Sequence, residues 1–113
     1  MPITNQQIAG HAFLQLMCDD PNFPDHVVDR GKAILLRLCE RAEAGEPSDL
    51  ETLYGLTQAA TEEFNLLDRE FVAAGSGIET VAREWICDKF CFVALAYGFA
   101  DADAEVLTAG RDW

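Results

Sequence analysis

Apolar residues recur at helical spacing along most of this chain, and the densest pattern lies in residues 76–98. One wide arc of that segment is apolar when residues are placed about 100° apart, as in an α-helix. The opposite side begins with acids and ends with apolar residues, so we expect a central helix that starts half exposed and ends enclosed. Ser76 and Glu79 have the spacing of a capping box, and Gly98 suits a left-handed stop. The arc comprises Ile78, Val81, Ala82, Trp85, Ile86, Phe90, Phe92, Val93, Ala96 and Tyr97.

Two helices are expected before this segment. Residues 5–18 form the first, opened by a capping box of Thr4 and Gln7. Pro24 suits the first turn of the second, which runs to about residue 44 and ends at Gly45. The apolar face of the first helix comprises Ile8, Ala9, Ala12, Phe13, Leu16 and Met17, and that of the second Val27, Val28, Ile34, Leu35, Leu38 and Ala42.

A long helix is expected over residues 50–74. Ser48 and Glu51 have the spacing of a third capping box at its start. Its apolar residues recur three or four apart and keep their phase across Gly55, which favours one helix over two. They are Leu50, Leu53, Tyr54, Ala60, Phe64, Leu67 and Phe71.

A short last helix is expected at residues 102–109, with Asp101 or Asp103 as its cap. No stretch has the strict alternation of an exposed strand, and the dipeptides typical of hairpin turns are missing. We therefore predict an all-α fold, a bundle of four main helices with a short fifth C-terminal helix, in a single domain that spans residues 1–113.

The charge of the chain narrows the classes of partner. Twenty acidic and eight basic residues give a formal net charge of −12. Nucleic acids and anionic membrane surfaces need clustered Lys and Arg, so neither is expected as a partner. The first residues lack a basic start with an apolar run behind it, so we expect no signal peptide, and no segment predicts a membrane span. The sequence therefore favours a cytoplasmic protein whose four cysteines are reduced.

The negative charge is concentrated in the predicted helix at residues 50–74 and in the C-terminal segment. Six acids and Arg69 give residues 47–75 a net charge of −5. Within that helix the acids have few cations to neutralise them, so their mutual repulsion is poorly compensated. This pattern has two interpretations, a solvated acidic face or a docking surface for a basic protein partner.

The four cysteines permit two interpretations as well. Cys87 and Cys91 are four residues apart on the predicted central helix, while Cys18 and Cys39 lie late in the first two helices. Thiolates that converge in a bundle bind zinc, yet no pair has the two-residue spacing typical of structural zinc sites. Free cysteine also packs as a small hydrophobe, and we prefer this second interpretation.

Two pairs of carboxylates supply an alternative chemistry. Glu62 and Glu63, with Glu84 and Asp88 on the central helix, loosely resemble the magnesium site of all-α nucleoside-triphosphate pyrophosphatases. That family has a third Glu where this chain has Leu66, and its second pair of acids is three apart rather than four. The resemblance implies a metal-dependent hydrolase of nucleotides or phosphate esters as the alternative function.

Lys89 falls within the apolar arc of the central helix. Such a lysine either extends its ammonium to water or pairs with a buried acid, for which Glu63 and Asp68 are the candidates. His11 and His26 lie at helix ends or loop margins, where a structural role is the preferred interpretation. No catalytic residue and no cofactor is predicted.

Short motifs along the whole chain resemble a small bacterial family of unknown function. They are Thr-Asn-Gln-Gln at 4–7, His-Ala-Phe at 11–13, Gly-Lys-Ala-Ile-Leu at 31–35, Ala-Ala-Thr-Glu-Glu-Phe-Asn at 59–65, Ala-Tyr-Gly-Phe at 96–99 and Arg-Asp-Trp at 111–113. The resemblance implies a stand-alone bacterial protein and supplies no activity to transfer. It directs attention to residues 61–65 and to the C-terminal tail. The candidate binding residues are Glu62, Glu63, Asn65, Glu70, Arg111 and Trp113.

Two functions from different classes follow. The preferred one is a non-enzymatic protein-interaction module that binds a basic partner, as small immunity or antitoxin proteins do. The alternative is the metal-dependent hydrolase described above. The two candidate residues of the C-terminal tail also have a purely structural interpretation. Trp113 would then anchor the last helix, and Arg111 would pair with an acid of residues 50–74. The apolar run at residues 90–97 permits either a monomer or a homodimer.

Overall fold

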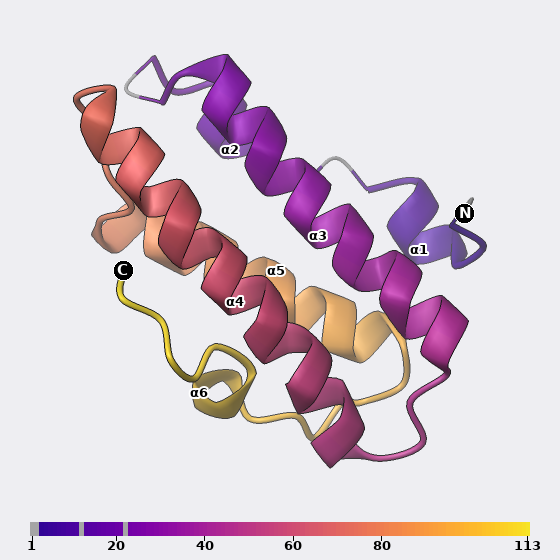
Figure 1. Ribbon diagram of the computed structural model, residues 1–113. Coiled ribbons are helices and arrows are strands. Elements are labelled where there is room, and N and C mark those ends of the chain that lie inside the picture. Colours follow the sequence, from indigo (N-terminus) through magenta and orange to yellow (C-terminus); the bar gives the residue numbers. More distant parts are fainter. Residues whose placement is uncertain (1–2, 12, 22) are drawn as a thin grey trace.

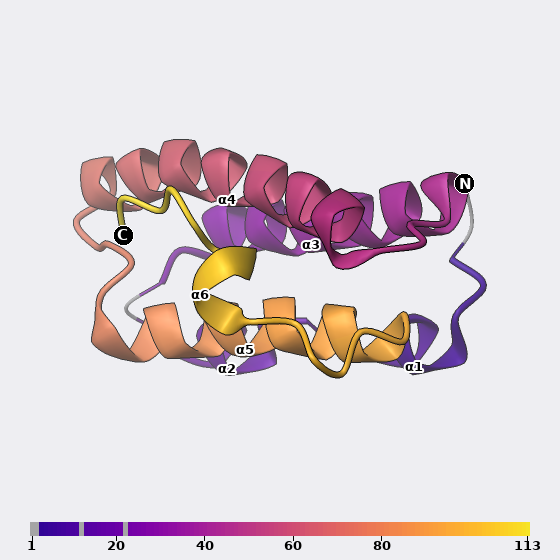
Figure 2. The same ribbon diagram turned by 90° about the horizontal axis from the view of Figure 1, so that it is seen from below.

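The helices form two layers that face one another. The computed structural model describes residues 3–11, 13–21 and 23–113. In Figures 1 and 2, α3 and α4 lie side by side in one layer, α5 lies with α1 and α2 in the other, and α6 packs at one edge against both α4 and α5. The helices are α1 (Gln6–Ala9), α2 (Gln15–Cys18), α3 (Asp25–Gly45), α4 (Leu50–Ala73), α5 (Thr80–Ala96) and α6 (Ala104–Leu107).

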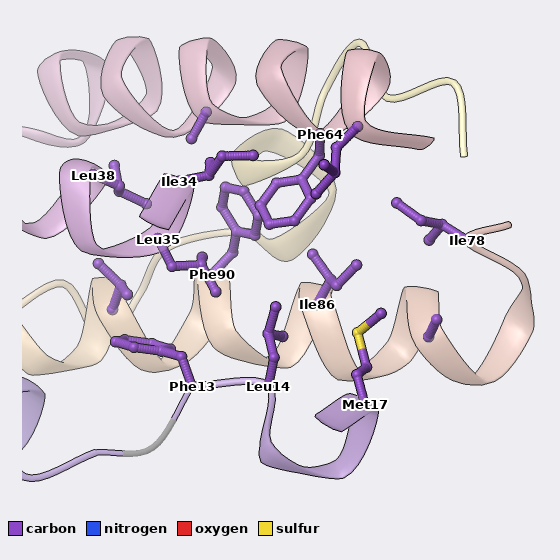
Figure 3. Packing of buried hydrophobic residues seen from close by; sticks show 14 of the residues in the cluster. Phe13, Leu14, Met17, Ile34, Leu35, Leu38, Phe64, Ile78, Ile86 and Phe90 are labelled. Carbon is purple, nitrogen blue, oxygen red and sulfur yellow. The ribbon is translucent and has the colours of Figure 1, made fainter. Parts of the chain in front are cut away.

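Apolar side chains fill the space between the layers. Phe64 from α4 and Phe90 from α5 meet edge to face with ring centroids 5.8 Å apart, and Figure 3 shows their neighbours from both layers pointing toward one another. The described residues contain helices and no strand, so the predicted all-α fold is confirmed. No helix in this part of the chain is both long and apolar enough to cross a membrane.

The predicted helix at residues 5–18 is wrong, because the chain forms two short helices instead. Asn5 caps α1 by accepting from the N–H groups of Gln7 and Ile8, so the predicted capping box of Thr4 and Gln7 does not form. The break between the helices ends at Leu14, which has a left-handed φ of 58°. Of the predicted apolar face, Ala12 lies outside the described residues.

The break changes which side chains reach the core. Leu14 is buried, whereas Leu16, which was predicted to be buried, is 58% exposed. Leu14 packs where α3 has Gly31, and a Cβ at that glycine would lie only 3.0 Å from Leu14 Cδ1. The N-terminal segment is therefore attached to α3 and α4 through Leu14, and not through the continuous apolar face predicted for one helix at residues 5–18.

The central helix α5 also differs from its prediction at both ends. It begins at Thr80, after Glu79, and the predicted capping box of Ser76 and Glu79 does not form. Asp68 on α4 instead fixes the preceding segment, because its Oδ1 accepts from the Ile78 N–H at 2.7 Å. The end of the helix is not enclosed, since Leu95 is 60% exposed.

The remaining boundaries agree closely with the sequence pattern. The helices α3 and α4 span nearly the predicted ranges and bury the predicted stripes. Asp49 rather than Ser48 caps α4, accepting from the Thr52 N–H. Asp103 caps α6, one of the two acids predicted for that position. Gly98 stops α5 with a φ of +91°, as expected.

Candidate functional site

A groove of about 260 Å³ lies between α3 and α4 and is open to solvent. We call it the α3–α4 groove. Two helices packed by their apolar stripes leave longer polar side chains along the rim of such a groove and shorter apolar ones on its floor. Its lining residues are Arg30, Ala33, Ile34, Arg37, Glu63, Leu66, Leu67 and Glu70.

Ion pairs join the two walls of the groove. Arg37 Nη2 lies 2.5 Å from Glu63 Oε1, and Arg30 pairs with Glu70. These side chains are between 31% and 58% exposed, so each pair contributes little to stability. Their main effect is local, because arginines of α3 neutralise acids that have no such partner within α4.

The second carboxylate oxygen of Glu63 has fewer hydrogen-bond partners than the first. Glu63 Oε2 is buried and accepts no hydrogen bond from the described residues. Arg41 forms a long ion pair with this oxygen, because its Nη1 lies 3.9 Å away, beyond hydrogen-bond distance. A buried carboxylate oxygen without a donor is costly, so this atom would gain from a donor supplied by another molecule.

An exposed leucine stands beside this carboxylate. Leu66 is 59% exposed, although it lines the groove whose floor includes the buried Ile34 and Leu67. Glu62, one turn before Leu66, is also exposed and forms no ion pair within the described part of the chain. The arrangement combines a central apolar side chain with a charged rim, which is typical of protein interfaces.

The structure divides the six predicted binding residues between two places. Glu63 and Glu70 line the α3–α4 groove, whereas Glu62 is exposed and is not among its lining residues. Asn65 instead fastens the C-terminal segment to α4. Its Nδ2 donates to the Gly110 carbonyl at 3.1 Å, and its Oδ1 accepts from the Asp112 N–H at 2.8 Å.

Arg111 and Trp113 belong to this C-terminal attachment as well. Trp113 is buried and packs edge to face against Phe64, with ring centroids 6.0 Å apart. Within residues 3–11, 13–21 and 23–113, the expected pairing of Arg111 with an acid is not observed. Its guanidinium instead donates to Thr108 Oγ1 at 3.1 Å and lies 5.8 Å from the Trp113 ring centroid. Both residues therefore hold the segment after α6 in place.

The carboxylates of the alternative hypothesis do not come together. Across the three described ranges, no three His, Cys, Asp or Glu side chains lie close enough to hold a metal ion. Glu63 is engaged by α3, and Asp88 lies 3.5 Å from the ammonium of Lys89. Lys89 therefore pairs with neither of the two candidate acids, Glu63 and Asp68, among the described residues.

The cysteines are also dispersed. All four are free thiols, and no group of metal-binding residues includes them in the described chain. Cys39 is buried and its pKa rises to about 12, mainly because burial disfavours the thiolate. Burial likewise raises the pKa values of Cys87 and Cys91. Each of these three thiols is therefore more strongly held in its protonated form than a free cysteine in water.

Arg30 and Arg37 of α3 line the groove, and neither was among the candidate residues predicted from the sequence. Arg30 and Arg37 are seven residues apart, as are Glu63 and Glu70. Seven residues are two helical turns, so each pair projects from one face of its helix. Equal spacing of opposite charges on two consecutive, antiparallel helices would have predicted both ion pairs, Arg30 with Glu70 and Arg37 with Glu63.

The polar groups described above join helix to helix in an all-α bundle. The chain belongs to a family of unknown function (DUF5713), whose model matches residues 7–113. The family resemblance expected from the sequence motifs is thereby confirmed. Comparisons with curated proteins and with solved structures gave no match.

Proposed function

We propose that the protein is a non-enzymatic interaction module that binds a basic protein partner at the α3–α4 groove. One observation carries this proposal. A buried carboxylate oxygen of Glu63 that lacks a donor lies in the same groove as Leu66, which is 59% exposed. A ligand that offers a cation beside an apolar side chain would satisfy both residues.

The recognition would proceed through these two contacts. A Lys or Arg of the partner displaces the half-exposed Arg41 side chain and donates to Glu63 Oε2, while an apolar side chain covers Leu66 and excludes water from the new ion pair. The net charge of −12 attracts a basic protein before contact and repels acidic ones. We place this encounter in the bacterial cytoplasm, where a small acidic protein of this kind would restrain a basic one.

Site-specific photo-crosslinking tests where a partner binds. A photoreactive phenylalanine analogue is installed at Leu66 of the full chain, and a matched analogue at Leu95, which is exposed to 60% but lies on α5. Both proteins are irradiated in lysate of the source bacterium. We expect one basic protein to crosslink at position 66 and not at 95, with a yield that falls as salt rises.

The captured protein is then purified and its affinity measured by calorimetry. Leu66→Asp should weaken binding ~10-fold or more, because it places charge in the apolar centre of the interface. Leu95→Asp adds the same charge and should change the affinity less than about twofold. Glu63→Gln should weaken binding and reduce its salt dependence. Equal effects at positions 66 and 95, or an acidic partner, would contradict the proposal.

A further inference from the structure

A second cavity, also of about 260 Å³, lies between α5 and the N-terminal segment. None of its residues takes part in the α3–α4 groove. Ligand pockets typically combine apolar walls with a few polar groups. Here the polar groups are His11, Gln15, Asp88 and Lys89, and the apolar walls are Leu14, Leu16 and Trp85. The amide of Gln15 already donates to Asp19 Oδ1 at 3.0 Å.

The ammonium of Lys89 has unused bonding capacity. The side chain is only 21% exposed, and its Nζ lies 5.7 Å from the ring centroid of Phe92. Its one ionic contact is to Asp88 Oδ2 at 3.5 Å, and it makes no hydrogen bond within the described residues. Asp88 is 72% exposed, so this carboxylate lies largely in solvent and leaves the ammonium able to bind an anion.

The imidazole of His11 offers a second donor. Its ring stacks on Phe92 at a centroid distance of 4.3 Å, and its Nε2 is buried without a hydrogen-bond partner in the described chain. Burial, and to a lesser degree the nearby Lys89 cation, lower the pKa of His11. A neutral imidazole keeps one N–H, which can donate to an anion.

One residue of the apolar lining has an unusual backbone. Leu14 adopts a left-handed φ of 58°, a region in which a leucine is rare. Packing of the Leu14 side chain against Gly31 of α3 maintains this conformation. The turn at Leu14 brings this residue and Leu16 to the cavity that Trp85 lines from α5.

We propose that this cavity binds the anion of a small monocarboxylic acid with an apolar body. The carboxylate accepts hydrogen bonds from Lys89 and His11. The body lies against Leu16 and Trp85, beside the buried Leu14. A polyanion is disfavoured, because Lys89 is the only cation among the described residues that line the cavity, and Asp88 lies beside it. The volume of about 260 Å³ lies below the ~300–1,000 Å³ of sites for drug-sized ligands, which favours a molecule the size of phenylacetate.

Titration of the full chain with phenylacetate tests the proposal. In two-dimensional NMR spectra we expect saturable shifts of the His11 imidazole signals and of the Trp85 indole N–H, while the indole N–H of Trp113 stays in place. Phenylacetamide, which has the same shape without the charge, and phenethylamine, which has the opposite charge, should not bind. Absence of saturable shifts, or equal binding of the amide, would overturn the proposal.

The two lysines of the chain provide a matched pair of variants. Lys89→Met should weaken phenylacetate binding ~10-fold or more, because it removes a charged donor. Lys32, the other lysine, lies beside Asp29 on α3, and Lys32→Met should change the affinity less than about twofold. Unchanged binding by Lys89→Met would refute the proposed role of the ammonium. If Lys89→Met does not fold, the NMR shifts of the unmodified chain with phenylacetate, compared with those with phenylacetamide, still test whether the cavity binds the carboxylate.

Discussion

Among single residues, Glu43 connects more of the chain than any acid of the candidate sites. Its Oε1 accepts from the Thr4 N–H at 2.8 Å and from Thr4 Oγ1 at 2.7 Å, and its Oε2 accepts from the Asn5 N–H at 3.1 Å and the Tyr97 hydroxyl at 2.5 Å. These bonds join the segment before α1 and the end of α5 to α3. They hold the pKa of Glu43 at about 2, because each one favours the carboxylate form.

Glu43→Gln should therefore destabilise the protein in a pH-dependent way. A carboxyl whose pKa falls from 4.5 to about 2 on folding contributes stability above pH 4.5, and the contribution is lost as the pH falls toward 2. We expect the variant to have a lower urea midpoint than the parent at pH 7, with a difference that narrows steadily between pH 4.5 and pH 2.5. Urea titrations monitored by circular dichroism measure both proteins.

Glu40→Gln is the control for this substitution. Glu40 lies one turn before Glu43 on α3 and makes no hydrogen bond through its side chain in the described chain. Its replacement removes the same charge without breaking the network, so its urea midpoint should stay close to that of the parent at each pH. A constant difference between Glu43→Gln and the parent at all pH values would mean that the carboxylate contributes through packing alone.

Sequence reasoning identified the acids of the groove but not Glu43. The charge pattern of residues 50–74 pointed to Glu62, Glu63 and Glu70, because their spacing along one helix is visible in the sequence. The partners of Glu43 are 38 to 54 residues away, so no local pattern reports them. The same limit applies to Asn65, whose bonds to the C-terminal segment exist only in the folded chain.

At the level of helices, prediction succeeded where one amphipathic stripe was long and regular. Such stripes define α3 and α4, and their boundaries needed no tertiary information. The segment at residues 5–18 had a similar stripe but failed as one helix. Packing of Leu14 against Gly31 favours a left-handed turn there, and tertiary contacts of this kind override helix propensity.

Two glycines within the long helices allow the competition between helix propensity and tertiary packing to be measured. Gly55 is exposed near the start of α4, and a methyl group there would have no heavy atom within 4 Å. Gly55→Ala should stabilise the protein by about 1 kcal/mol, because alanine loses less backbone entropy on entering a helix. Thermal unfolding should show a midpoint that is higher by a few degrees.

Gly31→Ala is the counterpart, with the same chemical change in a crowded place. The new Cβ would lie 3.0 Å from Leu14 Cδ1 and 3.4 Å from side-chain atoms of Phe64 and Leu67. Overpacking costs ~1–3 kcal/mol, which exceeds the gain in helix propensity, so we expect a net loss of about 1 kcal/mol. A variant as stable as Gly55→Ala would show that Leu14 moves freely and that the turn does not depend on this contact.

For the whole molecule, the excess of negative charge is only locally neutralised. The arginines of α3 neutralise Glu63 and Glu70 at the groove, yet the formal net charge remains −12. The radius of gyration is 13.4 Å, which is shorter than the Debye length of ~30 Å at 0.01 M salt. At low ionic strength most charges therefore repel one another across the entire fold.

Added salt should consequently stabilise the protein. Raising NaCl from ~0.01 M to ~0.15 M shortens the Debye length to ~8 Å and screens this repulsion, so the midpoint of thermal unfolding should rise by several degrees. Glu62 and Glu84 are exposed and form no ion pair in the described chain. Changing both to Lys brings the formal net charge from −12 to −8 and should reduce the rise. A midpoint that falls with salt would mean that the ion pairs between α3 and α4 outweigh the repulsion among the remaining acids.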